Sequence, residues 1–261
     1  MSDTTALPPL QGRVVLVTRP AHQSGRQATL IREAGGEPLL FPTLRIEALA
    51  GSTAASVALA NLPECHYAIF ISANAVEHGL ASLASEWPPQ VRVVAIGDGT
   101  AAALRAHGLV EVIVPSVATD SDGVLALPEL DRLGGMRVLI FRGQGGRELL
   151  ADTLRKRGAE VAYVECYRRV RPDQDPSALL QRWERGGIHA VTAMSGETLE
   201  NLWTMIGARG QPLLLTTPLF VPHLAIAERA GRLGLTEVAV TAPGDEGIVR
   251  GLGAWFSLHV R

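Results

Sequence analysis

Short apolar segments alternate with amphipathic segments along most of the chain. The apolar segments are rich in Val and Ile and lack a polar face, which is typical of strands buried on both sides in a parallel sheet. The segments between them place apolar residues at helical spacing and end at glycines, as helices often do. The alternation predicts an α/β fold with mostly parallel sheets flanked by helices. The expected strands are residues 13–18, 67–72, 91–97, 110–115, 136–141, 159–165, 189–194, 218–222 and 237–242.

The pattern also repeats within the chain. Arg19 in VLVTRP has a counterpart 123 residues later in VLIFRG, Arg142, and the same shift places Ser72 on Ser195. Farther on, HGLVEVIV (107–114) resembles a segment 126 residues later. Three matches in the same order at nearly one shift favour an internal duplication of an α/β unit.

Two extended segments, residues 39–49 and 164–172, interrupt the alternation at about the same spacing. A proline in an extended segment indicates an edge strand or a connector. If both segments are connectors, the chain crosses twice between two similar lobes joined by a two-stranded connector. One lobe is then expected to comprise residues 1–44 plus 169–261, and the other residues 45–168. A cleft between the lobes is the expected small-molecule site.

Composition narrows the range of functions. Hydrophobic residues make up 47% of the 261-residue chain and charged residues 19%, which favours a sizeable core over disorder. The formal net charge of −2 gives no global basic field, so no nucleic-acid partner is expected. Lys156 is the single lysine, so nearly all positive charge is guanidinium, which suits bidentate binding of carboxylate or phosphate. An arginine-rich genome would give the same imbalance.

Other classes of protein are disfavoured by what the sequence lacks. Cys65 and Cys166 have neither disulfide-framework nor metal-site spacing. The first residues show no signal-peptide pattern, and no apolar run approaches the roughly 20 residues of a membrane span. We therefore expect a cytoplasmic protein with no membrane partner.

The segment RGQGGR (142–147) is a strand–glycine–helix junction flanked by two arginines. Glycines at such a junction let backbone N–H groups approach an anion at the start of a helix. The spacing of Gly143, Gly145 and Gly146 is neither GxGxxG nor a Walker loop, so an anion is favoured over a nucleotide. The alternative is a tight turn with solvated Arg142 and Arg147. The matching Arg19 ends a strand as well, where open α/β sheets bind ligands, or is a surface arginine.

Other junctions carry hydroxyl groups and glycines. Ser72 and Ser195 each follow a strand, where they could cap the next helix or bind carboxylates, whereas the surroundings of a nucleophilic serine are missing. Asn74 lies two positions after Ser72. In AIGDGTAAAL, Gly97 precedes an expected helix whose first turn contains Thr100, as a cap or as a binding group.

Two aromatic side chains complete the candidates. His223 in FVPHLAIAERA corresponds to the Gly97–Thr100 junction, although a lone histidine is usually structural or exposed. Tyr167 in VECYRRV lies on a proposed connector, where it either packs against its surroundings or donates a proton to a leaving hydroxyl.

Six segments of the chain carry a family resemblance. In chain order they are VLVTRP, FISANAV, AIGDGTAAAL, RGQGGRELLADTLRKRGAEVAYVECYRR, SGETLENLW and FVPHLAIAERA. Together they resemble the bacterial uroporphyrinogen-III synthase family. The resemblance spans residues 13–253 and is most specific over residues 142–169. It implies two α/β lobes and an enzyme that closes linear hydroxymethylbilane to uroporphyrinogen III, with inversion of the last pyrrole ring and loss of water. It also implies no metal or organic cofactor. The alternatives are a two-lobed transferase or a binding protein for a small anionic or phosphorylated ligand.

The resemblance also implies roles for particular residues. Tyr167 matches the family tyrosine proposed to help the hydroxyl leave. Ser72, Thr100, Ser195 and the backbone near Gly196 match positions that face a substrate with eight carboxylates. Three motif arginines also match, and either bind this substrate or brace loops: Arg19, Arg142 and Arg147. The further candidates for binding it are Asn74, Gly97, Gly143, Gly145 and His223. Related sequences often have an arginine or serine within the VPH region, whereas here Leu224 and Ala225 follow His223. A monomer is expected, and the enzyme that forms the bilane is a candidate partner.

Overall fold

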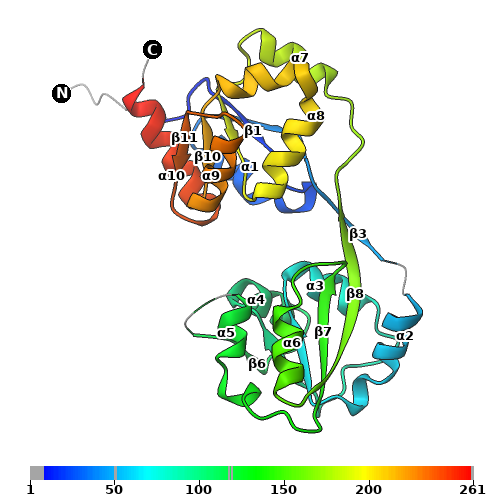
Figure 1. Cartoon of the computed structure of the whole chain (residues 1–261). Helices are drawn as coiled ribbons and strands as arrows, with labels where there is room; N and C mark the ends of the chain where they lie inside the picture. The colour runs from blue at the N-terminus through cyan, green and yellow to red at the C-terminus, as the bar shows by residue number, and fades with distance from the viewer. Residues whose placement is uncertain (1–8, 50–51, 117, 119, 260–261) are drawn as a thin grey trace, which may run out of the picture. The chain divides into compact units, whose positions relative to one another are not determined.

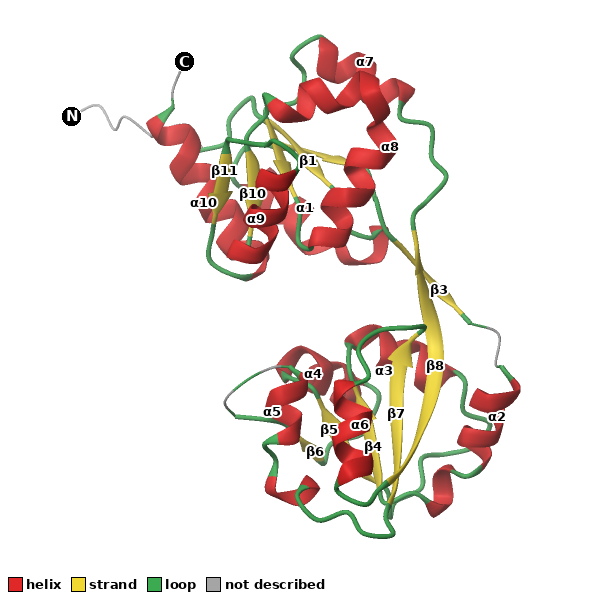
Figure 2. Ribbon diagram, viewed as in Figure 1, coloured by secondary structure: helices red, strands yellow, loops and turns green. Residues whose placement is uncertain are grey.

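The computed structural model describes residues 9–49, 52–116, 118 and 120–259. The chain divides into two units, of which the first comprises Met1–Arg45 and Val170–Arg261 and the second comprises Ile46–Arg169. From the sequence, the two boundaries were expected after residues 44 and 168. Each expected boundary is one residue before the boundary in the structure. Each unit contains one sheet with helices on both faces (Figures 1 and 2).

The first unit has five parallel strands in the order β11-β10-β9-β1-β2. Helices α7, α8 and α9 pack on one face of this sheet, and α1 and α10 pack on the other. The strands are β1 Val14–Val17, β2 Glu37–Leu40, β9 Ala190–Thr192, β10 Leu219–Val221 and β11 Val238–Val240. The helices are η1 Ala21–Gln23, α1 Gly25–Glu33, α7 Ser177–Glu184, α8 Gly196–Leu215, α9 Leu224–Arg232 and α10 Gly244–Leu258.

The second unit has six strands in the order β3-β8-β7-β4-β5-β6, and the five from β8 to β6 pair in parallel. Helices α2, α3 and α4 cover one face, and α5 and α6 cover the other. The strands are β3 Arg45–Ala48, β4 Tyr67–Phe70, β5 Arg92–Ala95, β6 Val112–Ile113, β7 Arg137–Gly143 and β8 Glu160–Val170. The helices are α2 Thr53–Ala60, η2 Leu62–Glu64, α3 Ala73–Ala81, α4 Asp98–Ala106, α5 Ser121–Leu125, η3 Pro128–Leu130 and α6 Leu149–Lys156.

The two sheets follow the same plan. The order β6-β5-β4-β7-β8 of the second unit corresponds, strand for strand at the sequence shifts found above, to β11-β10-β9-β1-β2 of the first. The helices correspond as well, so that α3 matches α8, α4 matches α9 and α6 matches α1, each on the equivalent face. This agrees with the internal duplication inferred from sequence.

The expected connectors need one correction. Residues 39–49 were expected to form a single connector, but Leu39 and Leu40 belong to β2, the edge strand that pairs with β1. Pro38 is tolerated there because an edge strand need not donate every backbone N–H group to a neighbour. Residues 164–172 continue the preceding expected strand, so that β8 runs for 11 residues. The chain passes between the units along β3 and β8, which are neighbours in one sheet.

Candidate functional site

Most of the predicted site residues lie at one edge of the second unit's sheet, where its parallel strands end. Ser72 follows β4, Gly97 follows β5, and the segment 142–147 follows β7. Tyr167 lies near the end of β8, beside the end of β7. The parallel topology explains this arrangement, because the carboxyl ends of all such strands meet at one edge.

A β-bulge determines the direction of Tyr167. Arg142 pairs with Glu165 but Gly143 pairs with Tyr167, so that β8 contains one extra residue, Cys166, at this point. Cys166 and Tyr167 therefore both pack into the core on the α3 side, whereas Tyr163 packs on the α6 side. Without the extra residue, the strict alternation of a strand would place Tyr167 on the same side as Tyr163. Bulges that redirect a side chain are common beside active sites.

Tyr167 is fully buried and its hydroxyl lies 3.1 Å from the Ser72 Oγ. Ser72 is half-buried and is the N-cap of α3, where its Oγ accepts a hydrogen bond from the Ala75 N–H. A serine oxygen accepts at most two hydrogen bonds and donates one. If Tyr167 donates to Ser72, both acceptor positions of Ser72 are filled and its own O–H is left to donate elsewhere.

The ring of Tyr167 requires a glycine next to it. A Cβ atom on Gly143 would lie 2.7 Å from the ring, which is closer than real Cβ contacts. His78 of α3 lies on another side, with its ring centroid 6.0 Å away. Gly143, predicted as part of an anion loop, therefore has a packing role beside the Tyr167 ring. On the same side of the sheet, burial raises the pKa of the neighbouring Cys166 thiol to about 11, so this thiol stays protonated near neutral pH.

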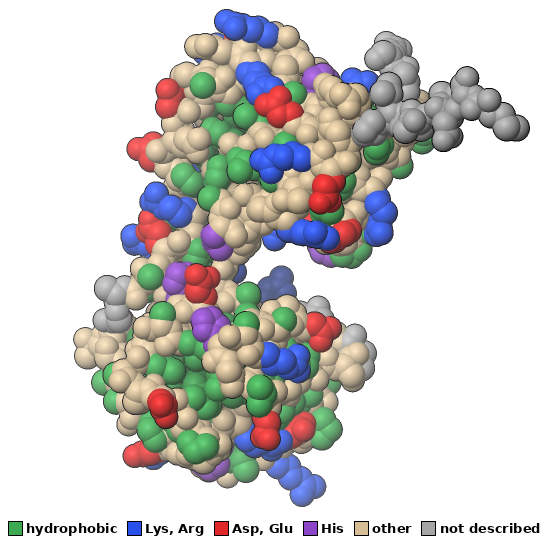
Figure 3. All heavy atoms as spheres, turned by 180° about the vertical axis from the view of Figure 1, so that it is seen from behind, with side chains coloured by type: hydrophobic (Ala, Val, Ile, Leu, Met, Phe, Trp, Pro, Cys, Tyr) green, Lys and Arg blue, Asp and Glu red, His purple; other side chains and the backbone are tan. Residues whose placement is uncertain are grey.

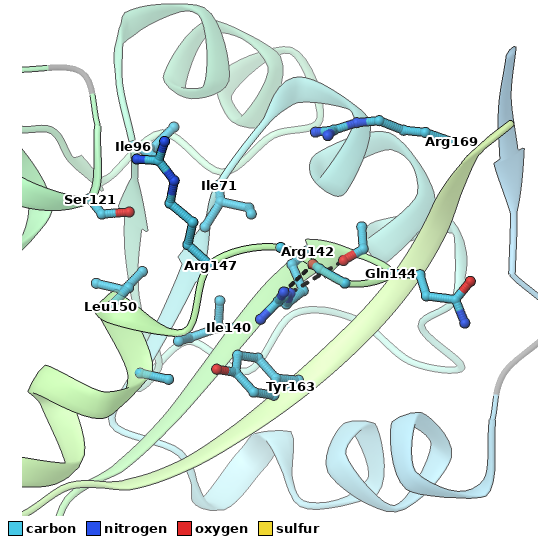
Figure 4. Close-up of a pocket in the computed structure, with 14 residues that line it drawn as sticks. Ile71, Ile96, Ser121, Ile140, Arg142, Gln144, Arg147, Leu150, Tyr163 and Arg169 are labelled. Carbon is cyan, nitrogen blue, oxygen red and sulfur yellow. Dashed lines mark hydrogen bonds between the residues drawn. The ribbon is translucent and has the colours of Figure 1, made fainter. Parts of the chain in front are cut away.

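Arg142 holds the glycine-rich turn together. It is 3% exposed, and its guanidinium donates to the Gly145 carbonyl and, at 2.9 Å, to the Glu148 carboxylate. Tyr163 donates a hydrogen bond to the same carboxylate, and the Arg142 guanidinium lies 4.6 Å from the centre of its ring. These hydrogen bonds, with Tyr163 first and Arg142 second, lower the pKa of Glu148. The buried charge of Arg142 is thus compensated within the turn. Figure 4 shows Arg142 beside Tyr163 in this turn.

Arg147 is placed differently. It is exposed and has no hydrogen-bond or ion-pair partner among the residues that the structure describes. With Arg142, Tyr163 and Ser121 it lines a cavity of about 280 Å³ on the α5 and α6 side of the sheet. Its side chain extends toward Ser121 and Ile96 (Figure 4).

The remaining predicted residues of this unit lie in first helical turns. Gly97 is the N-cap of α4, and Thr100 follows in the first turn, where it is buried. Asn74 lies in the first turn of α3 and is half-buried.

The first unit has corresponding residues at the carboxyl edge of its own sheet. Ser195 caps α8 in a reciprocal capping box with Thr198, which supports the cap interpretation. Gly196 packs against the Arg229 side chain. His223 is the exposed N-cap of α9, but its side chain makes no capping hydrogen bond. Arg19 forms an ion pair with Asp245, at the start of α10.

Four residues of these networks were missed by sequence reasoning: Ser121, Glu148, Tyr163 and Asp245. Glu148 could have been suspected as a carboxylate next to two arginines at the start of a helix. Asp245 and Ser121 carry a fainter signal, because they occupy equivalent positions in the repeated segments ATDSDG (118–123) and APGDEG (242–247).

The described residues contain no group of three or more His, Cys, Asp or Glu side chains that could hold a metal ion. In the part of the chain that the structure covers, no helix has the length and apolarity needed to span a membrane. On the face drawn in Figure 3, positive and negative side chains are intermixed over each unit.

Comparison with known proteins identifies the family. The model of the family described as Uroporphyrinogen-III synthase HemD matches residues 26–250. The chain belongs to this family. It is 35% identical to the uroporphyrinogen-III synthase of Salmonella typhimurium over 237 residues, which cover 88% of this chain and 96% of that protein. The Escherichia coli protein of the same name is 34% identical over 237 residues, which again cover 88% of this chain and 96% of that protein.

Solved structures show the same two-lobed α/β fold. A mutant uroporphyrinogen III synthase from Thermus thermophilus matches with a TM-score of 0.62 at 18% identity, over 95% of this chain and all of that one. The Helicobacter pylori uroporphyrinogen-III synthetase matches with a TM-score of 0.58 at 14% identity, again over 95% of this chain and all of that one. The fold class and the family resemblance expected from the sequence are confirmed.

Proposed function

We propose that this chain catalyses the closure of hydroxymethylbilane to uroporphyrinogen III, with inversion of the last pyrrole ring and loss of water. The observation that carries the proposal is its 35% identity to a curated uroporphyrinogen-III synthase along nearly the whole of both chains. The reaction needs no protein nucleophile, since a pyrrole carbon of the substrate attacks. The protein has to bind a polycarboxylate, help a hydroxyl leave and orient the cation that results.

We assign the proton delivered to the leaving hydroxyl to the Ser72–Tyr167 pair. Tyr167 is fully buried, so the half-buried Ser72 is the member that can meet a substrate. Ser72 would give its proton to the leaving oxygen as the carbon–oxygen bond breaks and the electron pair departs with the oxygen. Tyr167 would replace that proton through the 3.1 Å contact. The pyrrole nitrogen supplies the electrons that form the azafulvenium cation, which keeps its N–H proton, and the Tyr167 phenolate left behind balances its charge, so charge and atoms balance without a cofactor.

We further propose that the predicted residues at the ends of the strands contribute to substrate binding. The exposed Arg147 and His223, and the first turns of α3, α4 and α8, supply charge and N–H groups suited to carboxylates. Arg142 and Arg19 are already paired with carboxylates of the chain, so we assign them to bracing the loops. A monomeric state, a cytoplasmic location and an interaction with the bilane-forming enzyme stay predictions from the sequence.

The test is a product analysis. Purified protein is given hydroxymethylbilane in the presence of a chelator, the products are oxidised, and the porphyrin isomers are separated by chromatography. We expect mainly isomer III, formed faster than the spontaneous closure. Isomer I alone, at the rate seen without protein, would show that the proposed activity is wrong.

A further inference from the structure

The cavity beside the glycine-rich turn has an unusual charge. Three arginines line it, namely Arg142, Arg147 and Arg169, and no aspartate or glutamate is among its described lining residues. Arg142 is compensated from behind by Glu148, whereas the described residues offer Arg147 no partner. Gly146 and Arg147 both line the cavity, and their backbone N–H groups have no acceptor among the described residues. An excess of donors with no acceptor is the arrangement that binds an anion.

The duplicated unit indicates what kind of anion fits. The segments 118–123 and 242–247 are equivalent, because a Cβ atom on either final glycine, Gly123 or Gly247, would lie 2.0 Å from the carbonyl oxygen of the alanine that begins the segment. In this register, Asp245 of the first unit corresponds to Ser121 of the second.

In the first unit, the Asp245 carboxylate reaches across to Arg19, the counterpart of Arg142. The second unit has a hydroxyl at this position instead, and the Ser121 oxygen points toward the side chain of Arg147 (Figure 4). The repeated arginine thus has a carboxylate in both units, Asp245 in the first and Glu148 in the second. The additional arginine of the second unit, Arg147, has no carboxylate partner among the described residues, and the position equivalent to Asp245 offers it only the Ser121 hydroxyl.

We propose that this cavity is a binding site for one carboxylate arm of the substrate, held by the Arg147 guanidinium and the Ser121 hydroxyl. The proposal rests on the proposed function for the identity of the ligand. A volume of about 280 Å³ is below the roughly 300–1,000 Å³ of pockets that enclose whole ligands, so it suits a side arm of a pyrrole rather than the entire tetrapyrrole. Ile71, Ile96 and Ile140 provide apolar contacts for the methylene groups of the arm.

The position of the cavity explains how binding and chemistry can proceed together. Gly143 lines the cavity and also contacts the Tyr167 ring, so the two sites lie on opposite sides of the same strand end. A carboxylate bound by Arg147 would anchor a ring at this edge while the Ser72–Tyr167 pair serves the reacting carbon. Such an anchor would act on binding of the substrate more than on the chemical step.

Steady-state kinetics of two variant pairs test the site. Arg147→Ala should raise the KM for hydroxymethylbilane about 10-fold or more with little change in kcat, because a charge-assisted hydrogen bond is lost in both ground and transition states. Arg147→Lys should recover part of the loss. Ser121→Asp should raise the KM strongly, since it places a competing carboxylate beside Arg147, whereas Ser121→Asn, which is neutral and isosteric with the aspartate, should have a much smaller effect.

Arg105→Ala is the matched control, because Arg105 is exposed in the last turn of α4, away from the carboxyl edge. Its KM should equal that of the wild type, and thermal midpoints should show that all variants are folded. Unchanged KM for Arg147→Ala, or equal KM for Ser121→Asp and Ser121→Asn, would overturn the site even if the wild type makes isomer III.

Direct binding separates the two proposals. Uroporphyrin I, a stable macrocycle with eight carboxylates, serves as the probe, and its affinity is measured by fluorescence titration. Weaker binding to Arg147→Ala than to the wild type would support the site even if no isomer III is formed. Equal binding by both proteins would contradict it.

Discussion

Tyr167 is fully buried, and we propose that it takes part in proton transfer. Its hydroxyl is out of reach of a substrate but within hydrogen-bond distance of Ser72. The serine is held by its cap bond to Ala75, which fixes the direction of the contact. In the mechanism that we propose, the tyrosine acts through the serine, so its removal should affect the rate of the chemical step rather than binding.

Tyr167→Phe is therefore expected to lower kcat about 100-fold or more while KM changes little, since general acid catalysis typically contributes this much. The ring contacts with Gly143 and His78 remain, so the fold should survive. Kinetics with hydroxymethylbilane provide the measurement, and circular dichroism verifies folding.

Tyr67→Phe is the matched control for this substitution. The Tyr67 hydroxyl accepts a hydrogen bond from Arg92 and donates one to the Glu129 carbonyl, but Tyr67 lies at the start of β4, at the opposite edge of the sheet. The kcat of the Tyr67→Phe enzyme should equal that of the wild type. A Tyr167→Phe enzyme with full kcat would remove the tyrosine from the mechanism.

Arg142 and Arg147 illustrate what sequence could predict at this scale. Both lie where an anion site was predicted, but one braces the turn and the other faces the cavity. The difference depends on Glu148 and Tyr163, which compensate the charge of Arg142 and make its burial tolerable. Spacing along the chain carries no information on which guanidinium receives these partners, so the sequence left the two roles open.

At the scale of elements, a histidine marks the start of the central strand in each unit. His189 precedes β9 and its Nδ1 accepts a hydrogen bond from the Val14 N–H at 2.9 Å. His66 precedes β4 and accepts from the Arg137 N–H in the same way. Such a bond requires an unprotonated Nδ1. For His189, burial first and the charges of Arg13 and Arg182 next lower the pKa.

The stability of the first unit should therefore depend on the protonation of His189. Because its pKa is lowered on folding, the unfolded chain binds the proton more readily. The contribution of neutral His189 to the stability of the fold is complete when the pH is above 6.5, the ordinary pKa of histidine. It is lost as the pH falls below that value. The thermal midpoint should thus fall between pH 7.5 and pH 5.5.

His189→Asn provides the comparison, since an amide oxygen can accept the Val14 N–H but does not titrate. Its thermal midpoint should fall less than that of the wild type over the same range. Equal losses in the two proteins would contradict the assignment.

The elements themselves were largely predictable, because strands buried on both faces stand out as apolar runs. Two features were not. β2 contains Pro38 and is half-exposed, so its pattern resembles a connector. The bulge at Cys166 depends on the pairing of β7 with β8, and a one-residue offset between strands leaves no trace in the alternation of either one.

For the whole molecule, the duplication implies that each unit carries its own core. Two buried clusters belong to the first unit and two to the second, one on each face of each sheet. Units of this size with separate cores are expected to fold as separate cooperative entities. Calorimetry should then resolve two unfolding transitions, one for each unit.

A pair of core substitutions can assign these transitions. Leu202 in α8 and Leu104 in α4 are both fully buried, one in each unit. Each Leu→Ala change should cost about 2–5 kcal/mol and lower the midpoint of its own unit by roughly 10 °C, leaving the other transition in place. Leu258→Ala, at a position that is 83% exposed, should change neither transition. A single transition that shifts equally with either core variant would mean that the two halves unfold as one cooperative body.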